Sequence, residues 1–521
     1  MLPEILALSP MPPLLAAVMI GCGMLAGVVK GEASERFTSR LGFWSVSLSF
    51  LLITLAIIFR FNSADPLADR IVFGTWIKSG SYHIDLAFNL DGLSLAFAGL
   101  TALFAVLVMR FSINYIHREG GFHRFFLVLC LFSAAMLVLA TAGNAALCFV
   151  GWELAGVCSF LLIAYQYDRS TAALNATRAF ITNRIGDAGF ILGIVFSFLW
   201  TGELSWSSIT GLDSHLEEWQ AGVLASCFLM AAVAKSALVP LAPWLARAME
   251  GPTPSSAIFY GVVMVHAGVY LVLRLQGLFE QAPFVMGLMA VIGLLTAFYG
   301  YFCGLVQSDV KSSLIFSTTG QLGLMFLAAG MGFWRLALFH LCAHALFRGY
   351  QFLASPSLMH GVIGISQRPV TPWLGKHRLL YLAAMQRLWL ENIGDQLVVK
   401  PVQQLGADLN AFDHQAIDPV FGLPAPMANL SIQSTVGFKS AEGSGIVDPE
   451  VLRVSGLFGL LMRASANASY WFEEKLVLQG LGPNMLSWGR RLGSRLNEFE
   501  GMLNQPRYLI VFILATLLAV F

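Results

Sequence analysis

The chain has 521 residues, of which 57% are hydrophobic and only 12% are charged, and its formal net charge is +1. A soluble globular protein carries roughly twice that share of charge. Together with a mean hydropathy of +0.71, this predicts a protein that crosses a membrane many times. There is no basic cluster with interleaved aromatic residues, which argues against a nucleic-acid partner. The seven cysteines lie in apolar runs without a C-x-x-C pair, so we expect no metal or iron–sulfur site and no cofactor.

Eleven apolar runs are long enough to cross a membrane as helices, which takes roughly 17–25 residues. They are residues 13–29, 41–59, 86–109, 122–142, 145–165, 179–200, 221–245, 254–275, 283–305, 311–330 and 333–355. Lysine and arginine are concentrated in the odd-numbered loops, for example at Lys30, Arg36 and Arg40 in the first. By the positive-inside rule, these loops are cytoplasmic. The sequence thus predicts an all-α polytopic protein of the cell inner (plasma) membrane with its N-terminus outside and no cleavable signal peptide.

The character of the chain changes after residue 355. Residues 356–506 contain ten of the 20 prolines and most of the remaining charge, and apolar and charged residues alternate there at helical spacing. Such helices are expected to lie along the membrane surface or against neighbouring spans. Residues 507–521 form a hydrophobic end of about 21 Å as a helix, which is shorter than a membrane core of ~30 Å. We interpret it as an anchor.

Two opposite charges stand out inside the spans. Glu153 lies in the run 145–165, and Lys235 lies mid-span with Pro240 and Pro243 close behind it. Each proline removes a backbone hydrogen bond, so the helix should break there. Because burial disfavours the charge of an amine and a nearby carboxylate favours it, the two groups could hold and release a proton. The alternative is a static ion pair that fixes helix packing.

Other titratable residues lie in neighbouring spans. Arg184 and Asp187 are three residues apart and share a helix face, as either a partner for Glu153 or an interfacial pair whose ends reach the membrane surface. His266 follows a Gly-Pro break at residues 251–254, and histidine is well suited to proton relay, although it can also serve packing.

The last spans add a further group of such residues. Lys311 opens the tenth run, while His340 and His344 are four residues apart on one face of the eleventh, which Arg348 continues. No third ligand accompanies the two histidines, so a proton path is favoured over a metal site. The whole series Glu153, Lys235, His266, Lys311, His340 and His344 could therefore carry charge laterally through the membrane.

Four segments in the right order carry a family resemblance. They are "WELAGVCSFLLIAYQYDRSTAALNATRAFITNRIGDAGFILG", "KSALVPLAPWLARAMEGPTPSSA", "KSSLIFSTTGQLGLMFLAAG" and "FHLCAHALFRGYQFLAS". Over about residues 85–355 the chain resembles the NuoL family, the antiporter-like subunit of respiratory complex I, which is related to the MrpA subunit of Na⁺/H⁺ antiporters. The resemblance implies a NuoL-like antiporter fold of inverted five-helix repeats, each with a broken helix.

The same resemblance implies domains and roles. It places N-terminal helices at 1–120, a first repeat at 121–280 and a truncated second repeat at 281–355, whose broken helix is missing. It assigns the proton or cation pathway to Glu153, Lys235, Lys311, His340 and His344, with Arg184 and Asp187 as the modulating pair. The chain departs from the family pattern in two ways: Tyr260 replaces a histidine that appears six residues later as His266, and Arg348 replaces a lysine.

NuoL-like chains outside complex I include the DabB/MpsA subunits, which pair with a large DabA-type protein resembling a carbonic anhydrase. The resemblance therefore implies a transport subunit, not itself catalytic, that moves H⁺ or Na⁺ to drive uptake of bicarbonate or CO₂ with a DabA-like soluble or peripheral partner. One alternative is a proton-pumping subunit of a complex I-type or membrane-bound hydrogenase complex. The other is a non-conducting membrane anchor.

Overall fold

The computed structural model describes residues 2–62, 69–79, 82–211, 216–361, 372–412 and 493–494. The described residues fall in two compact units. Residues up to Val399 belong to the first, and those from Lys400 onward belong to the second. In the second unit, helix α20 (Lys400–Phe412) is amphipathic, and the first unit contains all the residues discussed as a site.

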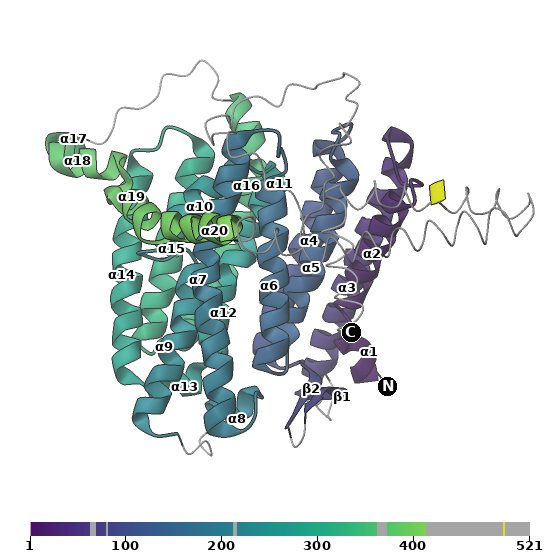
Figure 1. Cartoon of the computed structure of the whole chain (residues 1–521), viewed down its shortest axis with the longest axis horizontal. Helices are drawn as coiled ribbons and strands as arrows, with labels where there is room; N and C mark the ends of the chain where they lie inside the picture. Colours follow the sequence, from purple (N-terminus) through teal and green to yellow (C-terminus); the bar gives the residue numbers. More distant parts are fainter. Residues whose placement is uncertain are drawn as a thin grey trace, which may run out of the picture. The chain divides into compact units, whose positions relative to one another are not determined.

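The first part of the first unit contains helices joined by a short hairpin (Figure 1). In chain order the elements are α1 (Leu2–Ala7), α2 (Met11–Leu25), η1 (Glu32–Ser34), α3 (Glu35–Asn62), β1 (Arg70–Ser79), β2 (Tyr82–Asn89), α4 (Gly92–Tyr115), α5 (Phe122–Thr141) and α6 (Ala145–Ile163). Helix α5 is almost completely enclosed by its neighbours. It therefore forms the core around which α2, α3, α4 and α6 pack.

The middle of the chain contains most of the irregular helices. The elements are α7 (Ser170–Thr201), α8 (Trp206–Thr210), α9 (Glu218–Lys235), α10 (Pro243–Arg247), η2 (Ala248–Glu250), α11 (Thr253–Ser256), η3 (Ala257–Val262), η4 (Met264–His266), α12 (Ala267–Arg274) and α13 (Gln276–Glu280). The span from α11 to α12 passes through a π-helical turn, η3, and a 3₁₀ turn, η4, before it becomes a regular α-helix. Such interruptions often accompany functional sites.

The remaining elements of the first unit begin with three long helices. In chain order, all the remaining elements are α14 (Pro283–Leu305), α15 (Val310–Gly330), α16 (Trp334–Gly361), α17 (Pro372–Lys376), α18 (Arg378–Met385), η5 (Arg387–Trp389), α19 (Leu390–Gly394) and η6 (Asp395–Val399). Glycines let α14 and α15 approach closely: a Cβ at Gly300 would lie 2.4 Å from the backbone nitrogen of Gly320. Small residues at such contacts are the usual means of helix association in membranes.

The predicted multi-pass helical fold is confirmed. Eight helical segments of the described residues are long and apolar enough to cross a membrane, and helices also occupy the other three runs, α2, α9 and α16. The run expected to begin at residue 86 is wrong at its start, because residues 82–89 form β2. The strand pairs antiparallel with β1, and the span α4 begins only at Gly92, capped by Asp91.

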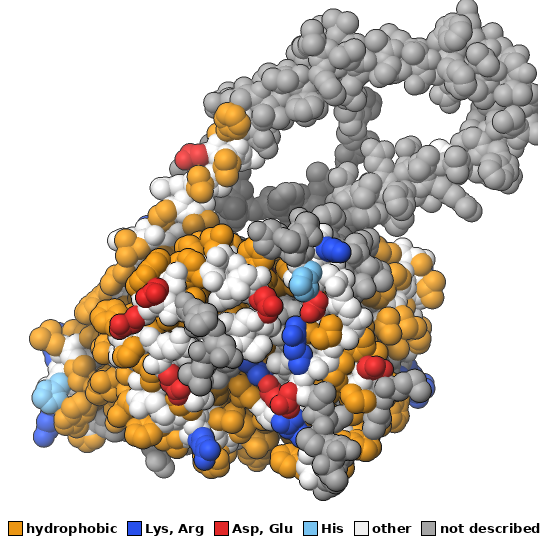
Figure 2. All heavy atoms as spheres, turned by 90° about the horizontal axis from the view of Figure 1, so that it is seen from below, with side chains coloured by type: hydrophobic (Ala, Val, Ile, Leu, Met, Phe, Trp, Pro, Cys, Tyr) orange, Lys and Arg blue, Asp and Glu red, His pale blue; other side chains and the backbone are white. Residues whose placement is uncertain are grey.

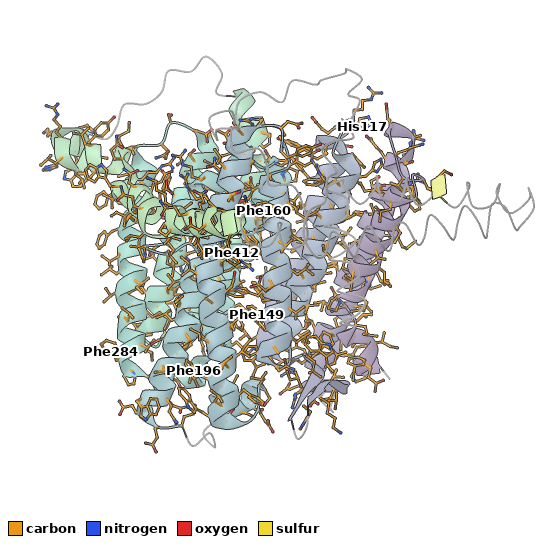
Figure 3. All side chains as sticks on the ribbon, viewed as in Figure 1. His117, Phe149, Phe160, Phe196, Phe284 and Phe412 are labelled. Atoms are coloured by element: carbon orange, nitrogen blue, oxygen red, sulfur yellow. The ribbon has the colours of Figure 1, made fainter. Side chains whose placement is uncertain are left out.

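The β1–β2 hairpin marks one end of the helix bundle, here called the hairpin end. The N-terminus and α8 lie at the same end (Figure 1). Figure 2 shows this end, where acidic and basic side chains are scattered among hydrophobic ones. The opposite end carries His117 (Figure 3), which lies in the loop between α4 and α5. Charged residues at both ends and apolar helices between them are what a membrane-spanning bundle requires.

A strap of short helices, α19 and η6, is fastened to the opposite end by ion pairs. Arg178 of α7 contacts Asp395 at 2.5 Å and Glu391 at 3.4 Å. Arg247 of α10 contacts the same Glu391 oxygen at 2.5 Å. The strap therefore joins α7 to α10, the helix that follows the break after α9.

Candidate functional site

Glu153 lies halfway along α6. The labelled residues Phe149 and Phe160 lie on either side of it on this helix, between the two ends of the bundle (Figure 3). Its carboxylate accepts a hydrogen bond from Nη1 of Arg184 on α7, and 23% of its side chain is exposed. A carboxylate at this depth is costly without a cationic partner, and Arg184 is that partner.

The same arginine also contacts Asp187, one turn further along α7. Nη2 of Arg184 lies 2.7 Å from Oδ2 of Asp187, and the other carboxylate oxygen accepts a hydrogen bond of 2.7 Å from the indole nitrogen of Trp152. Only 4% of the Asp187 side chain is exposed. An interfacial pair would reach the membrane surface with its charged ends, so the burial of Asp187 favours the alternative in which Arg184 is a partner for Glu153.

Lys235 is the last residue of α9 and is only 1% exposed. Its ammonium group donates a hydrogen bond of 2.9 Å to the carbonyl of Trp152 and lies 5.0 Å from the centre of that indole ring. The structure records no ion pair between Lys235 and Glu153, two residues that it fully describes. The two groups are instead linked through Trp152, Asp187 and Arg184, so the direct acid–amine couple expected from the sequence is replaced by a network.

Gly156 leaves room for the two cations of this network. A Cβ at this position would lie 3.2 Å from Nη2 of Arg184 and 3.4 Å from Nζ of Lys235. Gly156 is one turn beyond Glu153 on the same face of α6. The missing side chain therefore lets an arginine and a lysine approach one face of a single helix.

The helix is interrupted directly after Lys235. Helix α9 ends there and α10 begins at Pro243, with Pro240 in the interruption. Trp244 of α10 returns to the end of α9 and donates a hydrogen bond of 3.0 Å to the carbonyl of Ala234. A cavity of about 20 Å³, lined in part by Pro240, Trp244 and Glu391, lies beside the break. This volume suffices for one water molecule.

Ser236 connects the break to the next irregular helix. Its hydroxyl donates a hydrogen bond of 2.7 Å to the carbonyl of Val265, the residue before His266. His266 itself is completely buried, and its Nε2 lies 2.9 Å from Nδ1 of His344 on α16. The structure thus brings together two of the histidines that the sequence places 78 residues apart.

Arg348 and His340 extend the histidine contact along α15 and α16. Arg348 donates hydrogen bonds to Ser317 (2.7 Å), Gln351 (2.8 Å) and, at 3.4 Å, Nε2 of His344. His340 is bound to Gln321 at 2.9 Å, and its ring centre lies 6.2 Å from that of His344. The chain of hydrogen bonds is therefore interrupted between His340 and His344, the two histidines of α16.

Lys311 lies apart from the other predicted residues. It occupies the first turn of α15, ten residues or about 15 Å along the helix from Gln321. Within the described part of the chain, no hydrogen bond or ion pair of Lys311 is recorded. Its predicted role as a central member of the pathway therefore has no contact to support it.

Two groups of residues, one around Trp152 and one around His344, can exchange a proton in this arrangement. Around Trp152 there are two carboxylates and two cations, so a proton held by Lys235 leaves the group electrically neutral and its loss leaves a net negative charge.

The sequence interpretation overlooked Trp152 because an aromatic residue in an apolar run carries no local signal of a polar role. Among the described residues, no cluster of three histidine, cysteine or acidic side chains could hold a metal.

Two protein families match this chain. Residues 142–368 match the family described as "NADH:quinone oxidoreductase/Mrp antiporter, TM". Residues 76–126 match "NADH-Ubiquinone oxidoreductase (complex I), chain 5 N-terminus". The clusters around Trp152 and around His344 lie inside the first match.

Several proteins of known name are similar over the same region. NAD(P)H-quinone oxidoreductase subunit 5, organellar chromatophore 1, of Paulinella chromatophora is 36% identical over 365 residues, which are 69% of this chain and 54% of that protein. NAD(P)H-quinone oxidoreductase chain 5 of Synechocystis sp. is 36% identical over 364 residues, 69% of this chain and 53% of that protein. The chain thus spans about half the length of these relatives.

A solved structure agrees with these matches. A chain in the structure of the Mrp complex from Dietzia sp. superposes with a TM-score of 0.60 and 26% sequence identity, covering 69% of this chain and 38% of that one. The multi-pass helical bundle, the break after Lys235 and both family matches agree with this structural similarity. Over residues 76–368, the chain is thus similar to antiporter-like membrane subunits, among them chain 5 of NADH–quinone oxidoreductase and a chain of an Mrp complex.

Proposed function

We propose that this chain is a cation-translocating subunit, for H⁺ or Na⁺, of an energy-coupled membrane complex. The observation that carries the proposal is the buried Lys235 at the end of a broken helix. Its ammonium group touches no carboxylate directly, yet two carboxylates and Arg184 lie close by. A movement of α9 relative to α6 would change which of these groups faces Lys235, and therefore whether it keeps its proton.

The contacts support the following pathway. In this proposal a proton leaves Lys235 toward His266, and support comes from Ser236, the residue after Lys235, which donates a hydrogen bond to the carbonyl of Val265 beside that histidine. His266 can exchange this proton with His344 across the 2.9 Å contact. Glu153, Asp187 and Arg184 set the charge around Lys235, and Arg348 positions His344. His340 and Lys311 stay candidates for a branch toward the opposite end of the bundle.

The partner and the driving reaction form the finer part of the proposal. We propose a DabA-like soluble or peripheral partner and the uptake of bicarbonate or CO₂, on the basis of the resemblance to DabB-type subunits. The names of the relatives support the alternative, in which a redox reaction of a complex I-type assembly drives the translocation. We also propose that the complex lies in the cell inner membrane with the hairpin end and the N-terminus outside, as the basic loops indicate.

One experiment tests translocation and partner together. The chain is purified in mild detergent with the proteins that accompany it and is reconstituted into vesicles. Two readouts are taken: uptake of labelled inorganic carbon driven by an imposed proton or sodium gradient, and quenching of a pH-sensitive dye after addition of NAD(P)H and a quinone. The first readout supports inorganic carbon transport, the second supports the redox alternative, and a wild-type complex that shows neither overturns the proposal.

Lys235→Met isolates the role of the buried amine, because methionine keeps the length of the side chain and removes the charge. We expect the readout that the wild-type complex shows to be lost. The control is Lys30→Met, which removes an exposed lysine between α2 and η1 and should leave transport unchanged. If Lys235→Met assembles normally and transports like the wild type, only the non-conducting anchor stands.

A further inference from the structure

A second group of buried polar side chains lies closer to the hairpin end than His266. Arg274, the last residue of α12, forms an ion pair with Asp91, which caps α4. A single nitrogen of Arg274, Nη2, donates hydrogen bonds to Asp91 (3.0 Å), Ser94 (2.7 Å) and the hydroxyl of Tyr270 (3.1 Å). We call these four residues the Arg274 cluster.

The cluster runs from the buried interior toward the hairpin end. Ser94 and Tyr270 are buried, with 0% and 1% exposed, while 8% of the Arg274 side chain and 21% of the Asp91 side chain are exposed. Asp91 is therefore the member that lies nearest to water. The preceding residue is tied to the hairpin end, because the backbone nitrogen of Leu90 donates to the carbonyl of Asp69, next to β1.

The cluster is aligned with the histidine contact. His266, Tyr270 and Arg274 are spaced four residues apart, which places all three on one face of the α12 span. The aromatic ring of Tyr270 stacks on Phe97 at 4.8 Å, and its hydroxyl donates a hydrogen bond of 2.6 Å to the carbonyl of Ala140. Packing therefore fixes the hydroxyl beside Nη2 of Arg274, the nitrogen that also contacts the carboxylate of Asp91.

We propose that Tyr270 and Asp91 release the translocated proton to water at the hairpin end. This proposal rests on the proposed function and supplies the exit that the sequence left open. The incoming proton, from His266 one turn earlier, binds the Tyr270 oxygen while the hydroxyl turns away from the carbonyl of Ala140 and gives its own proton to Asp91, which shares the Arg274 nitrogen with it. Asp91 then gives its proton to water, so both side chains return to their starting states.

Arg274 is a positioning residue in this scheme. Its guanidinium stays protonated and has no acceptor, so it does not carry the proton, but it gathers the three oxygens around one nitrogen. Burial raises the pKa of Asp91, and the hydrogen bond and positive charge of Arg274 outweigh this effect, so that its pKa lies below the usual value. A proton that reaches Asp91 is therefore passed on rather than held.

The alternative is a static ion pair that fastens α12 to α4, and Tyr270→Phe separates the two. This change removes one hydroxyl and keeps the ring, its stacking and the Arg274–Asp91 ion pair. We expect proton transport to fall about a hundredfold, the lower edge of what a positioned proton carrier contributes. The matched control is Tyr299→Phe, since Tyr299 is equally buried and its hydroxyl has no hydrogen-bond partner in the described part of the chain. Transport in this control should be unchanged.

Chemical rescue gives a second, independent readout. Asp91→Ala removes the carboxylate, and formate supplied on the hairpin side of the vesicles can replace it. We expect formate to restore transport in Asp91→Ala and to have no effect on Lys235→Met.

The outcomes keep this inference separate from the proposed function. Unaltered transport in Lys235→Met defeats the proposed function. Loss of transport in Lys235→Met together with full transport in Tyr270→Phe, or with no rescue of a stably assembled Asp91→Ala, defeats the release site alone.

Discussion

Trp152 and Asp187 are joined by a hydrogen bond of 2.7 Å between the indole nitrogen and a buried carboxylate. The backbone carbonyl of the same tryptophan accepts the bond from Lys235. One residue of α6 thus contacts an acid on α7 and an amine on α9. Any movement of α6 changes both contacts together, which is a direct mechanical link between the two charges.

Trp152→Phe tests this link. The change keeps a large aromatic ring and removes the indole donor, so Asp187 loses a hydrogen bond inside the bundle. We expect the free energy of unfolding to fall by about 1.5–3 kcal/mol, the usual contribution of a hydrogen bond to a charged group, and transport to fall as well. Thermal unfolding in detergent measures the first effect. Phe149→Leu, one turn away on α6, is the control, and an equal loss of transport there would contradict the role of the indole.

Gly156→Ala tests the space between the two cations. Alanine favours a helix by about 1 kcal/mol over glycine, whereas crowding in a packed site costs about 1–3 kcal/mol. We therefore expect little net change in stability but slower transport, because Arg184 and Lys235 must move apart. Gly222→Ala on α9, where nothing lies within 4 Å of the added Cβ, should gain stability and transport normally. Normal transport in Gly156→Ala would show that the close approach is unimportant.

The pair Glu153 and Arg184 is suited to a double-mutant cycle. Arg184→Gln leaves two carboxylates without their cation, and Glu153→Gln leaves the arginine with Asp187 alone. If the ion pair operates as the structure indicates, the double variant is less destabilised than the sum of the single ones, by about 0.5–3 kcal/mol. Unfolding monitored in the same detergent gives the coupling energy. Strict additivity would mean that the two side chains do not interact.

Arg348→Lys tests geometry at constant charge. The planar guanidinium of Arg348 reaches Ser317, Gln351 and His344 at once, which the point charge of a lysine cannot do. We expect transport to fall although the charge is kept. Arg335→Lys, on the same helix, is the control for the exchange itself. Full activity of Arg348→Lys would show that charge alone suffices at this position.

The ion pair between Asp91 and Arg274 predicts a pH dependence of stability. Because the pKa of Asp91 is lowered in the folded protein, its contribution is fully present above the pKa of an unfolded aspartate, about 3.9. It is lost only as the pH falls through the lower, folded value. The difference in melting temperature between wild type and Asp91→Asn should therefore be constant from neutral pH to about pH 5 and shrink only in stronger acid. A difference that shrinks near neutral pH would contradict the ion pair.

Local sequence patterns were enough to find the spans, the charges inside them and the break after Lys235. Length, hydropathy and the two prolines are local properties, so they need no knowledge of the neighbours. The contact between His266 and His344 and the double role of Trp152 depend on which helices pack together, and no short pattern contains that information. The strand β2 was missed for another reason: its apolar residues merge with the following span, so that a hydropathy average extends the helix through it.

The strap of α19 and η6 has a consequence for observing this protein at work. Its acidic residues hold α7 and α10 at the same time, so those two helices cannot separate unless an ion pair opens. Ile393 on the strap has 46% of its surface exposed and offers an attachment point for a spectroscopic label. A label there would sense the broken helix shifting during turnover from a position outside the proton path, without altering any group that carries charge.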